Sequence, residues 1–203
     1  WLKNETSKPK IDFKKLFHPM MLANPIDEEK DFKRLNASEF QAEYKWDGIR
    51  VQLMVSSKSV SLYSRTGDNI SSAFPEIVEN TKGDAVIDGE LLVGRNFKPS
   101  GFNDLQQRLN RKKASKDLQE KFPVFIRAYD ILFYKGKDLR KLFLYERRKY
   151  LEKFQKENTT NQIDLSLIIK FKTWKELTKY KNNVYDDLNA VSYTHLRAHE
   201  TFA

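Results

Sequence analysis

The 203-residue sequence contains no cysteine. This absence excludes a disulfide scaffold, a thiolate zinc site, an iron–sulfur cluster and a cysteine nucleophile, and it favours a reducing, intracellular compartment. Long apolar runs are also missing, since none approaches the roughly 20 residues that a membrane-spanning helix needs. No basic-then-apolar leader opens the chain. We therefore expect an intracellular protein with no membrane association.

Two glycine-rich signatures of nucleotide-binding proteins are absent as well. The sequence has neither G-x-x-x-x-G-K-[ST] nor G-x-G-x-x-G, so any nucleotide must be held by other means. Acidic residues are outnumbered, with 28 Asp and Glu against 37 Lys and Arg and a formal net charge of +9. This excess favours a polyanionic partner such as nucleic acid, but many modestly basic proteins bind none, so a motif must decide.

Residues 1–16 are rich in lysine, weakly periodic and begin without Met, and we interpret them as a linker from an upstream region. Alternating polarity and β-branched or aromatic runs predict strands at 49–55, 60–64, 85–93 and 124–134, and at 167–172 after a polar loop at 156–166. Helical patterns predict helices at 28–35, 103–110, 140–155 and 174–181. This order, without strict β-α-β alternation or an internal repeat, predicts an α+β domain with antiparallel strands.

The helix expected at 140–155 has a clear division of polarity. Leu142 and Phe143 belong to its predicted apolar stripe, and Arg147 and Arg148 to its predicted solvent face. The basic run from Arg108 to Lys116 is expected either on another solvated face or in contact with phosphates.

One octet, Glu43 to Arg50, concentrates charged residues around a lysine. In extended geometry Glu43, Lys45 and Asp47 share one face, and Gly48 permits a tight backbone turn. We therefore expect three charged groups to converge on one pocket. On its own, a lysine between two carboxylates is more typical of an exposed, salt-bridged strand edge, so the rest of the sequence has to decide.

The octet matches the nucleotidyl-transfer motif K-x-D-G-x-R, and the chain from about residue 17 to 183 resembles ATP-dependent DNA ligases. Further segments agree with that family in order and spacing: Phe17 to Pro25, Ser64 to Asn69, Phe74 to Ile77, Asp88 to Leu91, Tyr129 to Leu132 with Gly136, and Leu142 to Arg148. The resemblance implies an ATP-grasp-like nucleotidyltransferase (adenylation) domain at 17–188, with antiparallel sheets flanked by helices. Bacterial repair-type ligases are the most similar, which implies a cytoplasmic location, with a nuclear one left open.

The chemistry of that family explains the residue types. An amine that attacks the α-phosphate of ATP must be neutral, yet an ordinary lysine is neutral in only about 4 molecules per 10,000 at pH 7. Burial and neighbouring cations, here Arg50, Arg65 and a bound Mg²⁺, would favour the neutral amine of Lys45. Cations placed around the phosphates would supply most of the acceleration.

The resemblance assigns roles to four residues around the nucleotide. Lys45 is the adenylated nucleophile, Glu43 accepts from the adenine amino group, and Arg50 contacts the nucleotide. Tyr129 occupies the position of the ring that stacks on adenine, although an aromatic residue in such a strand is also a common core residue.

Three further residues take roles by the same resemblance. Arg65 resembles the arginine that holds a terminal phosphate, and its alternative is a cap on the second strand of the hairpin. Glu90 resembles the acidic residue that contacts the ribose or supports the metal, and its alternative is a turn carboxylate paired with lysine. Asp47 is the second catalytic residue of the motif, associated with the nick-sealing steps.

The resemblance implies an ATP-dependent DNA ligase that uses ATP and Mg²⁺, acts on nicked double-stranded DNA as a monomer, and serves repair, replication or recombination. Rival enzymes share the lysine motif, namely an mRNA-capping guanylyltransferase that uses GTP and an RNA ligase. The acceptor Glu43, which suits the amino group of adenine, and the segment Tyr129 to Leu132 favour the DNA ligase. A non-catalytic DNA-binding fragment is the alternative outside enzymes.

The sequence departs from the family near its end. By the resemblance, the family pattern continues past the end of this chain with a second acidic motif, a K-x-K motif and an OB-fold, and we expect these, together with an upstream region, in the parent protein. Residues 189–203 are anomalous, and the stretch from Ser192 to Thr201 resembles translated sequencing adapter. His195 and His199 have a helical zinc spacing, but no third ligand is in view. We therefore expect impaired nick sealing from this 203-residue piece.

Overall fold

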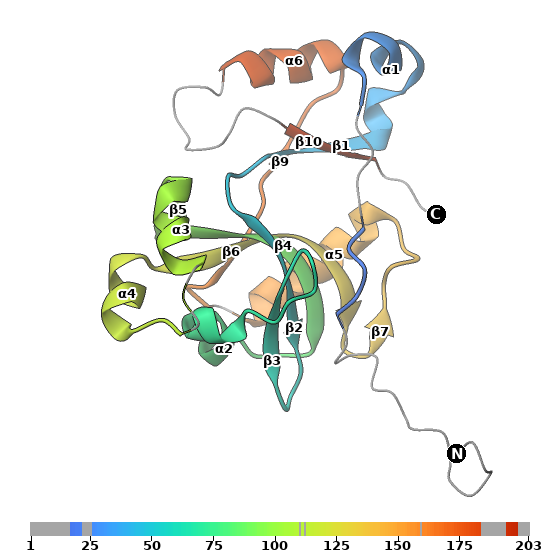
Figure 1. Cartoon of the computed structure of the whole chain (residues 1–203). Helices are drawn as coiled ribbons and strands as arrows, with labels where there is room; N and C mark the ends of the chain where they lie inside the picture. Colours follow the sequence, from blue (N-terminus) through green and yellow to red (C-terminus); the bar gives the residue numbers. More distant parts are fainter. Residues whose placement is uncertain are drawn as a thin grey trace, which may run out of the picture.

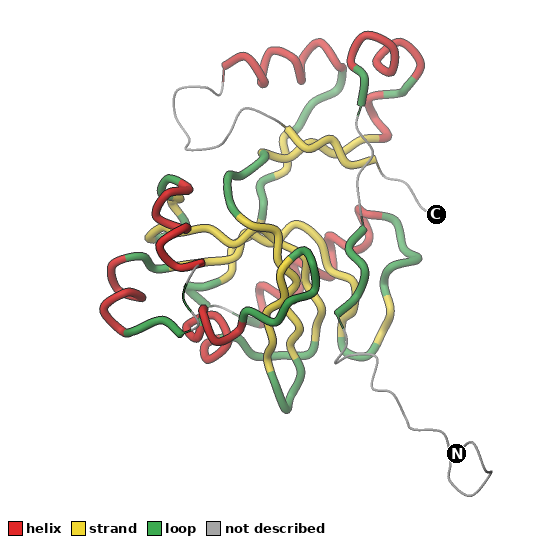
Figure 2. Tube along the Cα trace, in the orientation of Figure 1, coloured by secondary structure: helices red, strands yellow, loops and turns green. Residues whose placement is uncertain are grey.

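The computed structural model describes residues 17–21, 26–109, 111, 113–158, 160–183 and 194–198. Helices and antiparallel strands are mixed along the chain, as the sequence predicts. The strands form a large sheet and a smaller sheet that lies above it in the view of Figures 1 and 2. Within the described residues no helix is long and apolar enough to cross a membrane. The linker expected at 1–16 and most of residues 189–203, the tail expected to be anomalous, lie outside the described residues.

The seven-stranded sheet has the order β3-β2-β4-β6-β7, with β5 paired to β4 and β8 to β6. Its strands are β2 (Ile49–Val55), β3 (Val60–Ser64), β4 (Ala85–Arg95), β5 (Lys98–Pro99), β6 (Val124–Tyr134), β7 (Lys137–Asp138) and β8 (Ile163–Leu165). The predicted hairpin and both predicted central strands are confirmed. The pairing of β6 with β8 is parallel, and β8 lies in the segment that the sequence predicts to be a loop.

The three-stranded sheet has the order β10-β1-β9. It consists of β1 (Phe40–Tyr44), β9 (Ile168–Ile169) and β10 (Thr194–Ala198), all paired antiparallel. His195 lies in β10, which is a strand, so it is not part of the helix that the zinc spacing of His195 and His199 would need. His199 lies outside the described residues. Residues 45–48 lead from β1 in this sheet to β2 in the large one.

Helices cover the two sheets (Figure 1). They are α1 (Glu28–Arg34), α2 (Pro75–Asn80), α3 (Phe102–Leu109), α4 (Lys116–Lys121), α5 (Leu144–Glu157) and α6 (Trp174–Asn183), with short 3-10 turns at Ala37–Glu39 and Ser71–Ala73. The Asp27 carboxylate accepts from two backbone N–H groups at the start of α1, a local signal that fits a short helix. Trp174 joins α6 to α1, because its indole N–H donates to the Leu35 carbonyl at 2.9 Å.

The main core lies on one face of the large sheet. Its buried members alternate along the strands and meet apolar residues of α2, α3 and α5; they include Val51, Leu53, Ile87, Leu91, Ile126, Ile77, Leu105, Leu151 and Phe154. Such period-two burial places the intervening residues on the opposite face. That second face carries the polar side chains of the candidate site.

The polarity predicted for the helix at 140–155, which corresponds to α5, is wrong at three positions. Helix α5 begins only at Leu144, and Phe143 before it is 42% exposed. Arg147 and Arg148 are buried. The guanidinium of Arg147 donates to both carboxylate oxygens of Asp130 on β6, at 2.8 and 2.9 Å. A partner brought by the neighbouring strand thus compensates the burial of this charge.

Candidate active site

The loop of residues 45–48 carries the predicted nucleophile. Lys45 and Asp47 are exposed, whereas Trp46 between them is buried. Strand β1 ends at Tyr44, and Asp47 and Gly48 form a bend. Lys45 and Asp47 are exposed on either side of Trp46, whereas Glu43 is buried in β1, so the three charged side chains do not all face the same environment. The burial invoked to favour a neutral Lys45 amine is not present either.

Gly48 holds the end of this loop close to β4. A Cβ atom at Gly48 would overlap the Leu91 carbonyl oxygen and would lie 2.8 Å from Cγ of Glu90. Only glycine permits this approach without a shift of the backbone. The close packing therefore fixes where the loop joins β2.

Glu43 comes from the smaller sheet. It lies in β1, is 2% exposed, and its Oε1 accepts a hydrogen bond of 2.5 Å from the Gln41 side-chain amide. The predicted adenine acceptor and the predicted nucleotide contact Arg50 therefore sit on different sheets, joined through the 45–48 loop.

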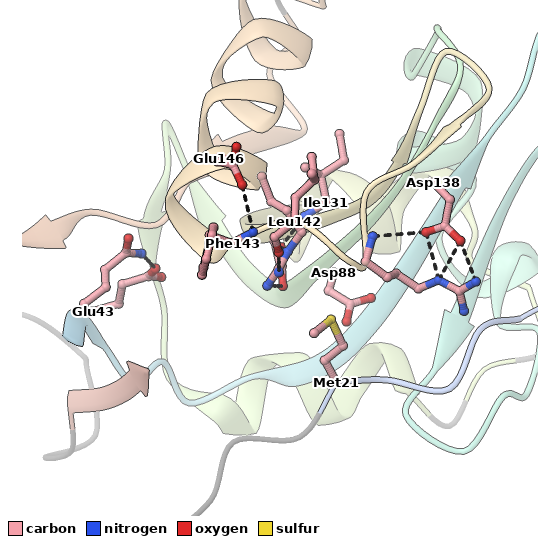
Figure 3. Close-up of polar contacts among 12 residues, drawn as sticks. Met21, Glu43, Asp88, Ile131, Asp138, Leu142, Phe143 and Glu146 are labelled. Atoms are coloured by element: carbon pink, nitrogen blue, oxygen red, sulfur yellow. Dashed lines mark hydrogen bonds and ion pairs between the residues drawn. The ribbon is translucent and has the colours of Figure 1, made fainter. Parts of the chain in front are cut away.

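The structure brings together two predicted nucleotide-binding residues, Arg50 on β2 and Tyr129 on β6. The Arg50 guanidinium lies 5.8 Å from the centroid of the Tyr129 ring. It also donates to the Asp88 carboxylate at 3.1 Å and to the Met21 carbonyl at 2.8 Å. Figure 3 shows Met21 beside Asp88. These contacts orient Arg50.

Tyr129 occupies an irregularity of the ladder between β4 and β6. Asp88 pairs with Asp130 and Gly89 pairs with Ala128, which makes Tyr129 the extra residue of a bulge in the register. A bulge of this kind re-aims a side chain. The ring is 93% buried, being 7% exposed, so both interpretations from the sequence, core packing and base stacking, remain compatible with its position.

Asp88 is a buried carboxyl that the sequence analysis did not single out as a site residue. It accepts from the Gln52 amide at 3.0 Å as well as from Arg50. Burial raises the pKa of Asp88, against the opposing effects of Arg50 and Gln52. The sequence could have indicated this residue by its spacing. Asp88 lies two residues before Glu90 and therefore on the same face of the strand.

Gln52 attaches the segment 17–21 to this face. Its amide oxygen accepts from the His18 backbone N–H at 2.8 Å, and its amide nitrogen donates to the His18 carbonyl at 3.1 Å. The His18 ring stacks on Phe133 with centroids 4.5 Å apart. The sequence offered no signal for this docking, since His18 and Gln52 are 34 positions apart.

Glu90 lies within β4, half-buried, opposite Arg50 on β2 and Arg127 on β6. The alternative of a turn carboxylate is therefore wrong. No group of three or more His, Cys, Asp or Glu residues within the described part of the chain is arranged to hold a metal ion. A Mg²⁺ ion at Glu90 would thus need oxygen ligands from nucleotide phosphates, which is a common arrangement for this ion.

Arg65 is exposed in the turn that follows β3. Ser64 pairs with Val51, so Arg65 lies at the same end of the hairpin as Arg50. The turn closes through backbone hydrogen bonds from Ser64 to Asp68 and from Gly67 to Ser64. Arg65 is therefore not buried in the core. A contact with a phosphate requires such an exposed side chain.

Arg108 behaves differently from the basic run to which it belongs. It is fully buried in α3, and its guanidinium donates to both carboxylate oxygens of Glu76 at 2.7 and 3.0 Å. It also donates to the carbonyls of Ala73 and Phe122. Arg108 therefore connects helices in the core, and neither the solvated face nor the phosphate contact applies to it.

Comparison with known proteins identifies similar sequences. Residues 20–188 match the family model described as ATP dependent DNA ligase domain. The chain is 38% identical over 130 residues to a probable DNA ligase of Koribacter versatilis, covering 60% of this chain and 22% of that protein. It is 34% identical over 160 residues to the DNA ligase of Methanococcus aeolicus, covering 75% and 28%. The chain thus spans about a quarter of these relatives.

Solved structures have the same fold. Mycobacterial DNA ligase D complexed with ATP superposes with a TM-score of 0.62 at 22% identity, covering 85% of this chain and 52% of that one. A Lig E DNA ligase gives 0.63 at 16% identity, covering 92% and 64%. The Chlorella virus DNA ligase-adenylate gives 0.57 at 14% identity, covering 86% and 58%. These likenesses confirm the expected nucleotidyltransferase fold.

Proposed function

The chain belongs to the ATP-dependent DNA ligase domain family, and from this premise we propose that it is an adenylation domain in which Lys45 takes AMP from ATP. The observation that carries the proposal is the placement of the K-W-D-G loop. It presents Lys45 and Asp47 to solvent just before β2, which holds Arg50, and the Arg50 guanidinium lies 5.8 Å from the centroid of the Tyr129 ring on β6. An amine on the loop, a cation on β2 and a flat ring on β6 suit attack on the α-phosphate of a bound nucleotide.

The proposed step balances simply. The lone pair of the Lys45 Nζ attacks the α-phosphorus, a P–N bond forms, and the P–O bond to the leaving pyrophosphate breaks. The amine loses its proton to solvent, and lysine–AMP remains. AMP then passes to the 5′-phosphate of a nick, and the 3′-hydroxyl displaces AMP to close the strand, with Asp47 acting in these later steps.

The nucleotide contacts follow from the site. Arg50, held by Asp88 and the Met21 carbonyl, would contact the nucleotide, and Tyr129 would stack on adenine. Glu43 would accept from the adenine amino group, and Arg65 would hold a terminal phosphate. Mg²⁺ bound to the phosphates, with Glu90 on the metal or on the ribose, would neutralise charge on the phosphoryl oxygens.

Labelling with ATP tests the proposal. The protein is incubated with α-labelled ATP and Mg²⁺, and mass spectrometry locates AMP. We expect label on Lys45, none in Lys45→Ala, and normal labelling in the control Lys58→Ala, which removes an exposed lysine of the β2–β3 turn. Absence of label from the unmodified protein would overturn the assignment.

Two rival functions are separated by the same preparation. Labelling by GTP instead of ATP would indicate a guanylyltransferase of the mRNA-capping type. Salt-sensitive retention of DNA without any label would indicate a binding fragment, for which the net charge of +9 is the supporting observation. Nick sealing, its part in repair, replication or recombination, action as a monomer and a bacterial cytoplasmic location are properties proposed for the whole protein.

A further inference from the structure

Trp46, in the middle of the loop that carries Lys45 and Asp47, stacks on Arg127 of β6. The Arg127 guanidinium lies 4.0 Å from the centroid of the Trp46 ring, the shortest of the cation–aromatic distances among the described residues. Trp46 is 7% exposed and Arg127 is 6% exposed. Leu92 and Phe125 complete the small apolar cluster around the ring. The side chain between the two exposed catalytic candidates is therefore anchored on the large sheet.

Arg127 is itself held on several sides. In the strand register it lies between Glu90 on β4 and Asp164 on β8. Its guanidinium donates to the Asp164 carboxylate at 2.9 Å and to the Phe97 carbonyl at 2.6 Å. A planar guanidinium can make such bonds along its edge while it offers its face to an indole ring. The Arg127 guanidinium, which we call the platform of Trp46, is therefore held in place by its own hydrogen bonds.

The loop needs such an anchor because the ladders end on both sides of it. Residues 45–48 belong to neither β1 nor β2, and the two strands lie in different sheets. Gly48 fixes the end of the loop by its packing against Leu91. Trp46 is the buried side chain within it. The position of Lys45 relative to the sheet thus depends on this ring.

We infer that Arg127 and Trp46 are positioning residues, which together hold the Lys45–Asp47 loop in the geometry for adenylyl transfer. This inference rests on the proposed function. Neither residue touches the reacting atoms in this account, so their loss should slow the chemical step more than it weakens nucleotide binding. Misplacement of a reacting group by about 1 Å can reduce a rate by about 100-fold.

Kinetics of lysine–AMP formation test the inference. We expect Arg127→Met to lower the single-turnover rate by about 10- to 100-fold, with the KM for ATP changed by less than about threefold. Arg127→Lys keeps the charge but loses the planar group that stacks on Trp46. Its rate should therefore lie between that of Arg127→Met and that of the unmodified protein. Trp46→Phe keeps an aromatic ring and a folded core, and it should lose less than Trp46→Leu.

The matched control is Arg140→Met. Arg140 also pairs with an aspartate, Asp138, at 2.7 Å and lies 4.9 Å from an aromatic ring, that of Phe133. It lies after β7, outside the loop and its platform, so its replacement should leave the rate per folded molecule unchanged.

A second measurement needs no nucleotide. Trypsin can cleave after the exposed Lys45, next to the buried Trp46, and cleavage after Lys58 in the β2–β3 turn serves as the internal reference. We expect Arg127→Met and Trp46→Leu to raise the ratio of cleavage at Lys45 to cleavage at Lys58 by about fivefold or more, because local opening exposes the bond.

The outcomes separate the two proposals. If the unmodified protein labels at Lys45 but Arg127→Met labels at the same rate, or if the cleavage ratio is unchanged, the positioning role is overturned and the proposed function stands. A rise in the KM for ATP that accounts for the whole loss would also overturn it. If the unmodified protein never labels, both proposals fail together.

Discussion

The two faces of the seven-stranded sheet differ sharply, although the same strands supply both. In β2, Val51 and Leu53 are fully buried in the apolar core, whereas Gln52 between them bonds to Asp88 and to the His18 backbone. In β4, Ile87 is a core residue and Asp88 next to it pairs with Arg50. A period of two residues thus lets one set of strands carry stability on one side and polar chemistry on the other.

The comparison shows that arginines paired with carboxylates occupy two kinds of place in this protein. Arg108 and Arg147 are buried arginines with carboxylate partners, and they connect helices to their surroundings. Arg50 is partly exposed, and its guanidinium lies near the Tyr129 ring. Residue type alone does not separate these roles. Exposure and the identity of the partner do.

The largest loss of stability should come from breaking the buried pair Asp130–Arg147. This variant tests whether one buried ion pair matters as much for the free energy of unfolding as an apolar core residue. We expect Arg147→Met to lower the free energy of unfolding by about 3–5 kcal/mol, since it leaves a buried carboxylate without its partner. Urea unfolding measures this. The control Arg140→Met breaks an exposed pair and should cost about 0–1 kcal/mol. Equal losses in the two variants would contradict the structural role.

Truncation on the core face should change stability without changing chemistry. Leu53→Ala removes a fully buried side chain, and we expect a loss of about 2–5 kcal/mol in the free energy of unfolding. The rate of lysine–AMP formation per folded molecule should stay the same. Leu167→Ala, at a leucine that is 66% exposed, is the matched control and should be nearly neutral. A slower reaction in folded Leu53→Ala would show that the two faces are coupled.

Gly48→Ala makes the converse change on the site face. The added methyl group collides with the Leu91 carbonyl and pushes the loop away from β4. We expect about a 100-fold loss in the rate of lysine–AMP formation, equivalent to about 2.7 kcal/mol. Gly101→Ala is the control, because a Cβ atom there meets nothing within 4 Å. An unaffected rate in Gly48→Ala would refute the close packing as a requirement.

The smallest effect concerns pH. The pKa of Asp88 is raised by burial from its ordinary value of 3.8, so the folded state favours the protonated carboxyl. Its contribution to stability is full below about pH 3.8 and is lost as pH rises through the raised pKa. We expect the unfolding free energy of the unmodified protein, minus that of Asp88→Asn, to fall over that window. A difference that is flat or rises with pH would contradict the sign.

Local patterns explain what could be predicted from the sequence. The hairpin of β2 and β3 follows from alternating residues, and its strands pair with each other at short range. The K-x-D-G-x-R octet was recognisable because its residues are contiguous. Strand β8 was missed, since its three residues pair in parallel with a distant part of β6.

Long-range partners explain what was missed or mispredicted in the site. Arg147 and its carboxylate partner are 17 positions apart, and Arg108 and Glu76 are 32 apart. The burial of Glu43 and the exposure of Lys45 depend on where β1 ends and how the 45–48 loop crosses between sheets. The roles assigned to the seven site residues stay predictions until nucleotide chemistry is measured.

The order of residues by itself determined the family, the α+β class, the hairpin and the lysine motif, because these depend on neighbours along the chain. Tertiary structure alone decided which arginines are structural, how segment 17–21 docks through Gln52, and that Trp46 rests on Arg127. The physical reason is that burial and pairing arise only when distant segments meet. A charge that is tolerable in water then needs the particular partner that folding brings to it.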